Sequence, residues 1–140
     1  MNDGLKMKGN LQIALNGKVI RNIKNLVVTD GKEFVASRMK GTSSGVMSHM
    51  AVGETDTAAA AGQTTLSGEV DRNALDSTGG SGADVIYTCT WAAGDGTGAL
   101  KEAGLFNAAS GGDMLARTVF SVVNKGASDS MTVTWTVTVS

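Results

Sequence analysis

His49 and Cys89 are the residues of this chain whose side chains most often carry catalysis, and each type occurs once in the 140 residues. A catalytic dyad or triad needs a histidine that is oriented by one group and hydrogen-bonded to a nucleophile. Only folding could pair His49 with a serine or with Cys89, because their sequence neighbourhoods show no such arrangement. We therefore interpret His49 as a half-buried strand or contact residue, and we predict no catalytic residues and no enzymatic activity.

The acidic residues include two close pairs that could bind a hard cation. Asp56 follows Glu54 closely, and Asp71 follows Glu69. Neither pair lies in an alternating-ligand loop with the central glycine that calcium sites prefer. The single cysteine also excludes an intrachain disulfide and a thiolate cluster. The sequence predicts no metal site, and these carboxylates are interpreted as solvated loop charges.

The glycine-rich stretch 94–98 resembles a phosphate-binding loop only superficially. Phosphate loops open a helix and are followed by a lysine and a hydroxyl residue, whereas this stretch lies between two expected strands and has no such pair after it. We predict a turn here and no bound cofactor.

The composition limits the partners and the compartment. The formal net charge is −1 and the twelve basic residues are scattered, which argues against nucleic-acid binding and against binding to an anionic membrane. No stretch approaches the roughly 20 apolar residues of a membrane span, and the first ten residues lack the apolar run of a secretory signal. A lone cysteine agrees with synthesis in a reducing cytoplasm.

The strongest structural signal is the alternation of apolar residues with threonines over residues 131–139. This period of two predicts a strand with one apolar face and one hydroxyl face. Asn16-Gly17 is typical of a tight hairpin turn. Further strands are expected at residues 11–15, 19–23, 26–29, 46–52, 83–91, 100–106 and 114–123, and residues 66–75 could form either a strand or a brief helix.

One short helix is expected after residue 29. Asp30 and Glu33 have the spacing of a capping box, in which each side chain bonds the other residue's backbone N–H. Gly41 is expected to end the helix. The residues between them place Phe34, Val35 and Met39 near one apolar stripe.

These elements predict an all-β protein with one short helix, built as an antiparallel β-sandwich of jelly-roll or Greek-key type. Residues 1–10 are expected to form an N-terminal arm, and residues 11–140 a single β-sandwich domain. Residues 53–65 have no usable periodicity and are interpreted as a surface linker. The expected core anchors are four aromatic residues of the strands: Trp91, Phe106, Phe120 and Trp135.

The chain contains 19 glycines and no proline, so it lacks one of the residues that blunt exposed sheet edges. We hypothesise that neighbouring chains cover these edges and that the arm takes part in the contact. The sequence leaves open which face of the strand 46–52 is buried. The hypothesised interface comprises residues of the arm and of that strand: Leu5, Lys6, Met7, Lys8, Met47, His49 and Met50.

The block from residue 100 to 139 resembles a pattern of virion proteins of tailed bacteriophages. It consists of E-A-G-L-F, a glycine turn, L-A-R with a strand to Phe, a K-G turn and an alternating T-W-T strand. The earlier A-V-G-E-T-D-T and L-S-G-E-V-D-R are similar to the linker and strand that precede it, so the resemblance covers about two thirds of the chain. The A-A-A-A-G run departs from the proline-containing linkers of similar proteins, which leaves the path of this linker open.

Within this group the chain most resembles a capsid decoration, or cement, protein. The resemblance implies a structural virion protein that binds the outer capsid surface and clamps neighbouring subunits, after synthesis in the host cytoplasm. The implied partners are the major capsid protein and further copies of this chain, as a dimer or trimer. Tail-fibre and collar modules share the pattern, so a tail-associated structural module is the alternative. A carbohydrate-binding module would need exposed aromatic residues, and both tryptophans are expected to face the core.

Overall fold

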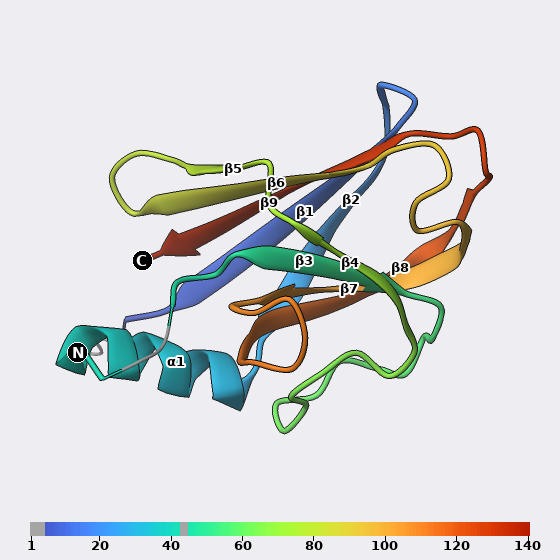
Figure 1. Ribbon diagram of the computed structural model, residues 1–140. Helices are drawn as coiled ribbons and strands as arrows, with labels where there is room; N and C mark the ends of the chain where they lie inside the picture. Colours follow the sequence, from blue (N-terminus) through green and yellow to red (C-terminus); the bar gives the residue numbers. More distant parts are fainter. Residues whose placement is uncertain (1–4, 43–44) are drawn as a thin grey trace.

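The computed structural model describes residues 5–42 and 45–140, which form nine strands and one helix (Figure 1). All strand pairs are antiparallel, and the order across the sheet is β4-β3-β7-β8-β2-β1-β9-β6-β5. The elements are β1 (Met7–Leu15), β2 (Lys18–Val27), α1 (Thr29–Lys40), β3 (His49–Gly53), β4 (Glu69–Ala74), β5 (Ser77–Gly79), β6 (Asp84–Trp91), β7 (Gly98–Phe106), β8 (Met114–Lys125) and β9 (Met131–Val139).

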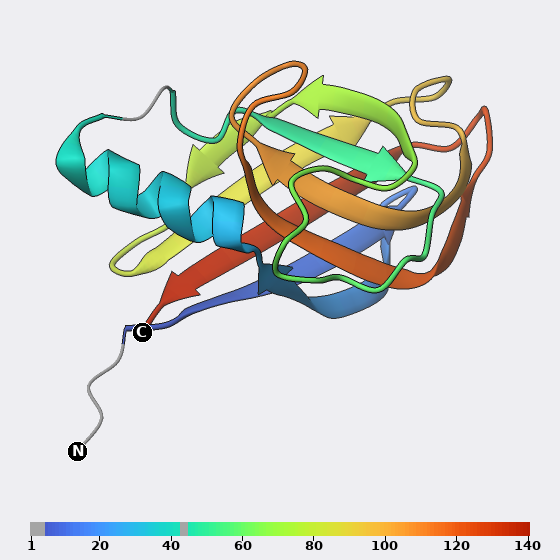
Figure 2. The same cartoon turned by 90° about the horizontal axis from the view of Figure 1, so that it is seen from below.

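The sheet curls into a half-barrel because two stretches of chain connect its two halves. Along β2, residues 18–25 pair with β1, and Leu26 and Val27 pair with β8. At the other side, β4 pairs with β3, and the chain continues directly into β5, which pairs with β6. The half formed by β3, β7 and β8 therefore lies across from the half formed by β1, β9 and β6 (Figure 2). The predicted antiparallel β structure with one short helix is confirmed in this coarse form.

The apolar residues form a large main core and a smaller second cluster. Trp91 and Trp135 are 0% exposed and Phe120 is 8% exposed, and all three lie in the main core. Phe106 is 1% exposed but belongs to the second cluster, where it packs with Leu66 and other side chains. All four aromatic anchors are thus buried, although Phe106 lies outside the main core.

Strand β3 is buried on both of its faces, which answers the question that the sequence left open. Met50 and Val52 belong to the main core, and Ala51 between them belongs to the second cluster. Met47, just before the strand, is 3% exposed and also lies in the main core. The strand begins at His49, three residues later than predicted.

The first strand begins earlier than its apolar pattern predicts. β1 starts at Met7 and pairs with β9 over nine consecutive residues, from Met7 opposite Val139 to Leu15 opposite Met131. Residues 7–10 of the predicted arm are therefore part of the sheet. Lys8 and Asn10 point to the solvent side of the strand and Gly9 has no side chain, so hydrophobic alternation gave no signal there.

The side chain of Asp30, which was predicted to cap helix α1, instead connects the helix to the sheet. The N-cap of α1 is Val28, and no side chain caps the helix, so the predicted capping box of Asp30 and Glu33 is wrong. Asp30 Oδ2 instead accepts a hydrogen bond from the Met114 N–H at 2.8 Å. This contact joins the first turn of the helix to the first residue of β8.

The faces and the end of α1 agree only partly with prediction. Gly41 ends the helix in the left-handed conformation, with φ of 69°, as predicted. Phe34 is buried, but Met39 is 85% exposed and does not belong to the apolar stripe. Gly31 lies against β8, where a Cβ would collide with the Leu115 backbone. The helix therefore packs closely through its first turns and less closely towards its end.

A hydrogen bond across three strands fixes Trp135 in the core. Trp135 Nε1 on β9 donates to Asn25 Oδ1 on β2 at 3.0 Å, and β1 lies between these two strands. The Asn25 side chain crosses β1 at Gly9, where any Cβ would collide with it. A glycine at this position is therefore what lets the amide reach the indole.

We expect Gly9→Ala to lower the free energy of unfolding by about 1 to 3 kcal/mol. The added methyl displaces Asn25 and leaves the buried indole N–H of Trp135 without its acceptor, and an unsatisfied buried donor costs about that much. Urea denaturation measures the change. Gly79→Ala in β5 is the matched control, because nothing lies within 4 Å of a Cβ there. Equal losses in both variants would contradict the crossing role of Gly9.

Candidate functional site

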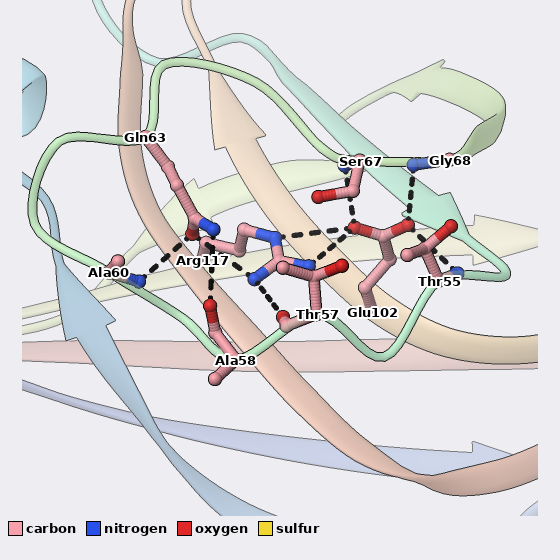
Figure 3. A network of polar contacts seen from close by, with 9 residues as sticks. All are labelled: Thr55, Thr57, Ala58, Ala60, Gln63, Ser67, Gly68, Glu102 and Arg117. Atoms are coloured by element: carbon pink, nitrogen blue, oxygen red, sulfur yellow. Dashed lines mark hydrogen bonds and ion pairs between the residues drawn. The ribbon is translucent and has the colours of Figure 1, made fainter.

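A buried ion pair between neighbouring strands is the most distinctive polar feature of the described chain. Glu102 on β7 and Arg117 on β8 both have side chains that are 0% exposed. Glu102 Oε1 lies 2.9 Å from Arg117 Nη2 and 3.2 Å from Nε (Figure 3). Arg117 is paired with Gly104 in the ladder, and Glu102 with Val119. This register places both charges on one face of the sheet, the face that carries the second cluster.

The carboxylate of Glu102 also binds the backbone of a loop. Its Oε1 accepts the Ser67 N–H at 3.0 Å, and its Oε2 accepts the Gly68 N–H at 2.9 Å and the Thr55 N–H at 3.1 Å. Thr55 lies at the beginning of the loop between β3 and β4, and Ser67 and Gly68 lie at its end. One side chain therefore fastens both ends of this loop to β7.

Arg117 binds the middle of the same loop. Its Nη1 donates to the Thr57 carbonyl at 2.7 Å and to Gln63 Oε1 at 3.1 Å. Gln63 in turn accepts the Ala60 N–H at 3.0 Å and donates to the Ala58 carbonyl at 3.1 Å (Figure 3). The alanine run, whose path the sequence left open, is thus folded around Gln63. The predicted surface linker is an ordered loop that covers the ion pair.

Every oxygen of Glu102 and every guanidinium nitrogen of Arg117 has a partner in this network. The pair is also fully buried. A general acid or base must exchange protons with a substrate, and this arrangement leaves no face of either group open to one. We therefore interpret the pair as an anchor that shapes the loop.

Sequence reasoning missed this pair, although both residues lie within the motifs E-A-G-L-F and L-A-R. A detectable signal was present: Glu102 and Arg117 are charged residues inside strands that are otherwise mainly apolar. Charged side chains are almost never fully buried unless they are paired. Two such residues on consecutive strands could have been matched with each other.

The sole histidine makes one short polar contact. Ser48 Oγ lies 2.8 Å from His49 Nδ1, and both residues are half-buried. Within residues 5–42 and 45–140, no carboxylate is hydrogen-bonded to the His49 ring to orient it. The neighbouring Met47 and Met50 are buried within the chain, so these two side chains cannot contact a partner. Of the three interface residues predicted in this segment, only the half-buried His49 is left.

The buried position of Cys89 suppresses its reactivity. The residue is 0% exposed, and its thiol lies 3.5 Å from the Ala74 carbonyl and 3.8 Å from the Asn73 carbonyl. Burial, together with the negative charge of Asp76, raises the pKa of the Cys89 thiol from 9.0 to about 12. The thiol therefore stays protonated near neutral pH, and the thiolate that would act as a nucleophile is scarce.

We expect Cys89 in the folded protein to react with Ellman's reagent at pH about 8 at least about 100-fold more slowly than in the unfolded chain, because both the thiolate and access to it are lacking. The coloured thiolate that the reagent releases is measured by its absorbance, and the reaction is followed for minutes to hours. The same protein in concentrated guanidinium chloride is the control and should release one equivalent quickly. Fast reaction of the folded protein would contradict the burial of Cys89.

One carboxylate of each acidic pair is engaged within the chain, and Glu69 and Asp71 lie on β4 and not in a loop. Glu69 forms an ion pair with Arg72 at 2.7 Å, and the Arg72 guanidinium lies 3.6 Å from the centre of the Phe106 ring. Glu54 Oε2 accepts the Ala99 N–H at 3.2 Å. Across the part of the chain that the structure describes, no three or more histidine, cysteine or acidic side chains gather as a metal site would require. Residues 94–97 lie between β6 and β7, and Gly94 and Gly96 have positive φ values of 89° and 59°, as the predicted turn requires.

No family model, curated protein or solved structure matches this chain. Among the described residues, no helix combines the length and the apolar character that crossing a membrane requires.

The hypothesised interface residues of the N-terminal segment lie at the surface around a hollow. Leu5 is 79% exposed, Lys6 and Lys8 are exposed, and Met7 is half-buried. All four line a hollow of about 400 Å³. A second hollow of about 410 Å³ shares Met7 and Lys8 with it. We call these two adjoining hollows the N-terminal groove.

Proposed function

We propose that this chain is a structural protein of a tailed-bacteriophage virion that binds the outer surface of the capsid and clamps neighbouring capsid subunits. The observation that carries the proposal is the position of the two charged residues of the virion-like motifs. Glu102 of E-A-G-L-F and Arg117 of L-A-R form the buried pair that fastens the loop between β3 and β4. The motif thus has a structural task, which suits a protein that acts by binding.

The fixed conformation of the loop between β3 and β4 would lower the entropic cost of binding to a capsid. Ordering a loop during association costs free energy, so a loop that is already fixed binds more tightly for the same contact area. A specific contact with the shell would bury about 1,000 to 2,000 Å². When one clamp engages several subunits, breaking one joint requires breaking linked contacts. The proposed partners are the major capsid protein and further copies of this chain, and the role requires no turnover.

We also propose that the curled sheet is a variant of the jelly-roll or Greek-key sandwich expected from the sequence. Its two halves face each other across the main core, and the chain passes between them along β2 and along β4 and β5. In some packings of two β-sheets face to face, single strands bend and pass from one sheet to the other at the corners. A tail-fibre, collar or other tail-associated module is the alternative function, because such modules share the motif pattern.

A reconstitution experiment tests the proposal. Purified protein is mixed with empty shells of the phage that encodes it, prepared without this chain, and the mixture is sedimented and heated. We expect saturable co-sedimentation and a higher temperature of shell disruption. Shells that already carry their full complement are the control and should bind no more. Protein that stays in the supernatant, or shells whose disruption temperature does not change, would contradict capsid clamping.

A further inference from the structure

The rim of the N-terminal groove carries an excess of positive charge. Four lysines border it: Lys6, Lys8 and Lys32 line one hollow, and Lys8 and Lys24 line the other. Neither hollow is lined by an aspartate or a glutamate. Because the whole chain has a formal net charge of −1, this concentration of lysines is a local feature.

These lysines are not neutralised within the described chain. In residues 5–42 and 45–140 the ion pairs are Arg72 with Glu69 and Arg117 with Glu102, so none involves a groove lysine. Ser140 exchanges backbone hydrogen bonds with Lys6, but it lines neither hollow. Asp84 Oδ1 accepts the hydroxyl of Thr138 at the border of one hollow, but it forms no ion pair with a groove lysine. Lysines around a concave surface whose lining contains no carboxylate attract an anionic group.

The groove is also partly apolar and its backbone is fixed. Leu5, Met7 and Val27 line the hollow that Lys6, Lys8 and Lys32 border. The backbone of this segment is held by the ladder between β1 and β9 and by the Lys6–Ser140 pair. Leu5 is exposed enough to lose substantial apolar area on contact, so a partner gains by placing an apolar side chain against it.

The side chains of the groove favour carboxylates over nucleic acid. No arginine and no aromatic residue lines either hollow. Nucleic-acid grooves rely on aromatic side chains that stack on bases and on arginines that grip phosphates with two hydrogen bonds. Lysines act as point charges beside an apolar floor, which matches an extended peptide that alternates acidic and apolar residues.

We propose that the N-terminal groove binds an acidic segment of a partner protein that carries an apolar side chain between its carboxylates. The identity of that partner as a capsid subunit rests on the proposed function. Lys6, Lys8, Lys24 and Lys32 pair with the carboxylates, and Leu5 and Met7 contact the apolar side chain. The groove thus supplies both the charge and the apolar contact of one joint of the clamp.

A pair of charge-reversal variants tests this groove in the shell-binding assay. Lys8→Glu/Lys24→Glu reverses two groove lysines, and Lys18→Glu/Lys40→Glu reverses two exposed lysines elsewhere with the same change of net charge. We expect the groove variant to bind shells at least about tenfold more weakly and the control to bind as the parent does. Thermal melting of both variants verifies that they fold.

The outcomes separate this inference from the proposed function. Binding of the parent with equal affinities of both variants would overturn the groove and leave the clamp standing. Failure of the parent to bind shells would overturn the clamp. In that case a labelled peptide of alternating glutamate and leucine tests the groove alone, and binding that only Lys8→Glu/Lys24→Glu abolishes would support it. Absence of such binding, or groove-dependent binding of a DNA duplex in place of the peptide, would overturn it.

Discussion

Replacing Arg117 with methionine is expected to lower the free energy of unfolding by about 3 to 5 kcal/mol, the range for removing one partner of a buried ion pair. Glu102 would then be a buried carboxylate without a counter-charge, since its side chain is 0% exposed. The backbone N–H groups of Thr55, Ser67 and Gly68 would be its remaining hydrogen-bond donors. Urea denaturation monitored by tryptophan fluorescence measures the change.

Hydrogen exchange adds a local measurement to this prediction. Because Arg117 also holds the Thr57 carbonyl and Gln63, the loop loses its central anchor, and its amides should exchange faster. Glu69→Gln is the comparison, since it removes an ion pair whose carboxylate is 31% exposed and whose Arg72 side chain is 6% exposed. Arg72 keeps its hydrogen bonds to the Ala108 and Gly111 carbonyls, so this change should cost less than Arg117→Met, about 1 kcal/mol. An Arg117→Met variant as stable as Glu69→Gln would show that the buried pair does not anchor the loop.

Replacing Trp135 with alanine is expected to cost about 3 to 5 kcal/mol, because truncating a buried aromatic residue removes its apolar contacts and leaves a cavity. Trp135 is 0% exposed and lies in the main core on the apolar face of β9. Its indole also donates to Asn25, and that bond is lost with the ring. Thermal melting and urea denaturation both report the change.

The threonine face of the same strand provides the matched control. Thr134 neighbours Trp135 but points to the other face and is half-buried, so Thr134→Ala should change stability by less than about 1 kcal/mol. Trp135→Phe should fall between the two, since it keeps an aromatic ring and loses the hydrogen bond to Asn25. An unchanged melting midpoint for Trp135→Ala would contradict the assignment of the faces of β9.

Local patterns predicted the parts of the fold that local physics determines. Residues 131–139 and 83–91 alternate because one face of each strand is buried, and they form β9 and β6 with Trp135 and Trp91 inside. The hairpin turn at residues 16–17 has the positive φ values, 50° and 82°, that the Asn-Gly dipeptide favours. These features depend on residues close in sequence, so the sequence alone reveals them.

Contacts between distant residues decided what the sequence could not predict. The Asp30 carboxylate bonds Met114, 84 residues away, in place of its own helix. The loop between β3 and β4 is ordered by Glu102 and Arg117, which lie outside it. For the same reason, only part of the hypothesised interface lies at the surface. Met50 is buried by strands that are distant in sequence, whereas Leu5 is exposed. The structure therefore corrected the role of individual residues more than the type of the elements.

Electron microscopy of virus particles, labelled with gold-conjugated antibodies against this chain, tests the proposed capsid location most directly. The account predicts gold over the outer surface of the head, at many sites per particle, and no gold on particles assembled without the chain. Gold confined to the tail, or purified particles that contain none of this protein, would contradict it.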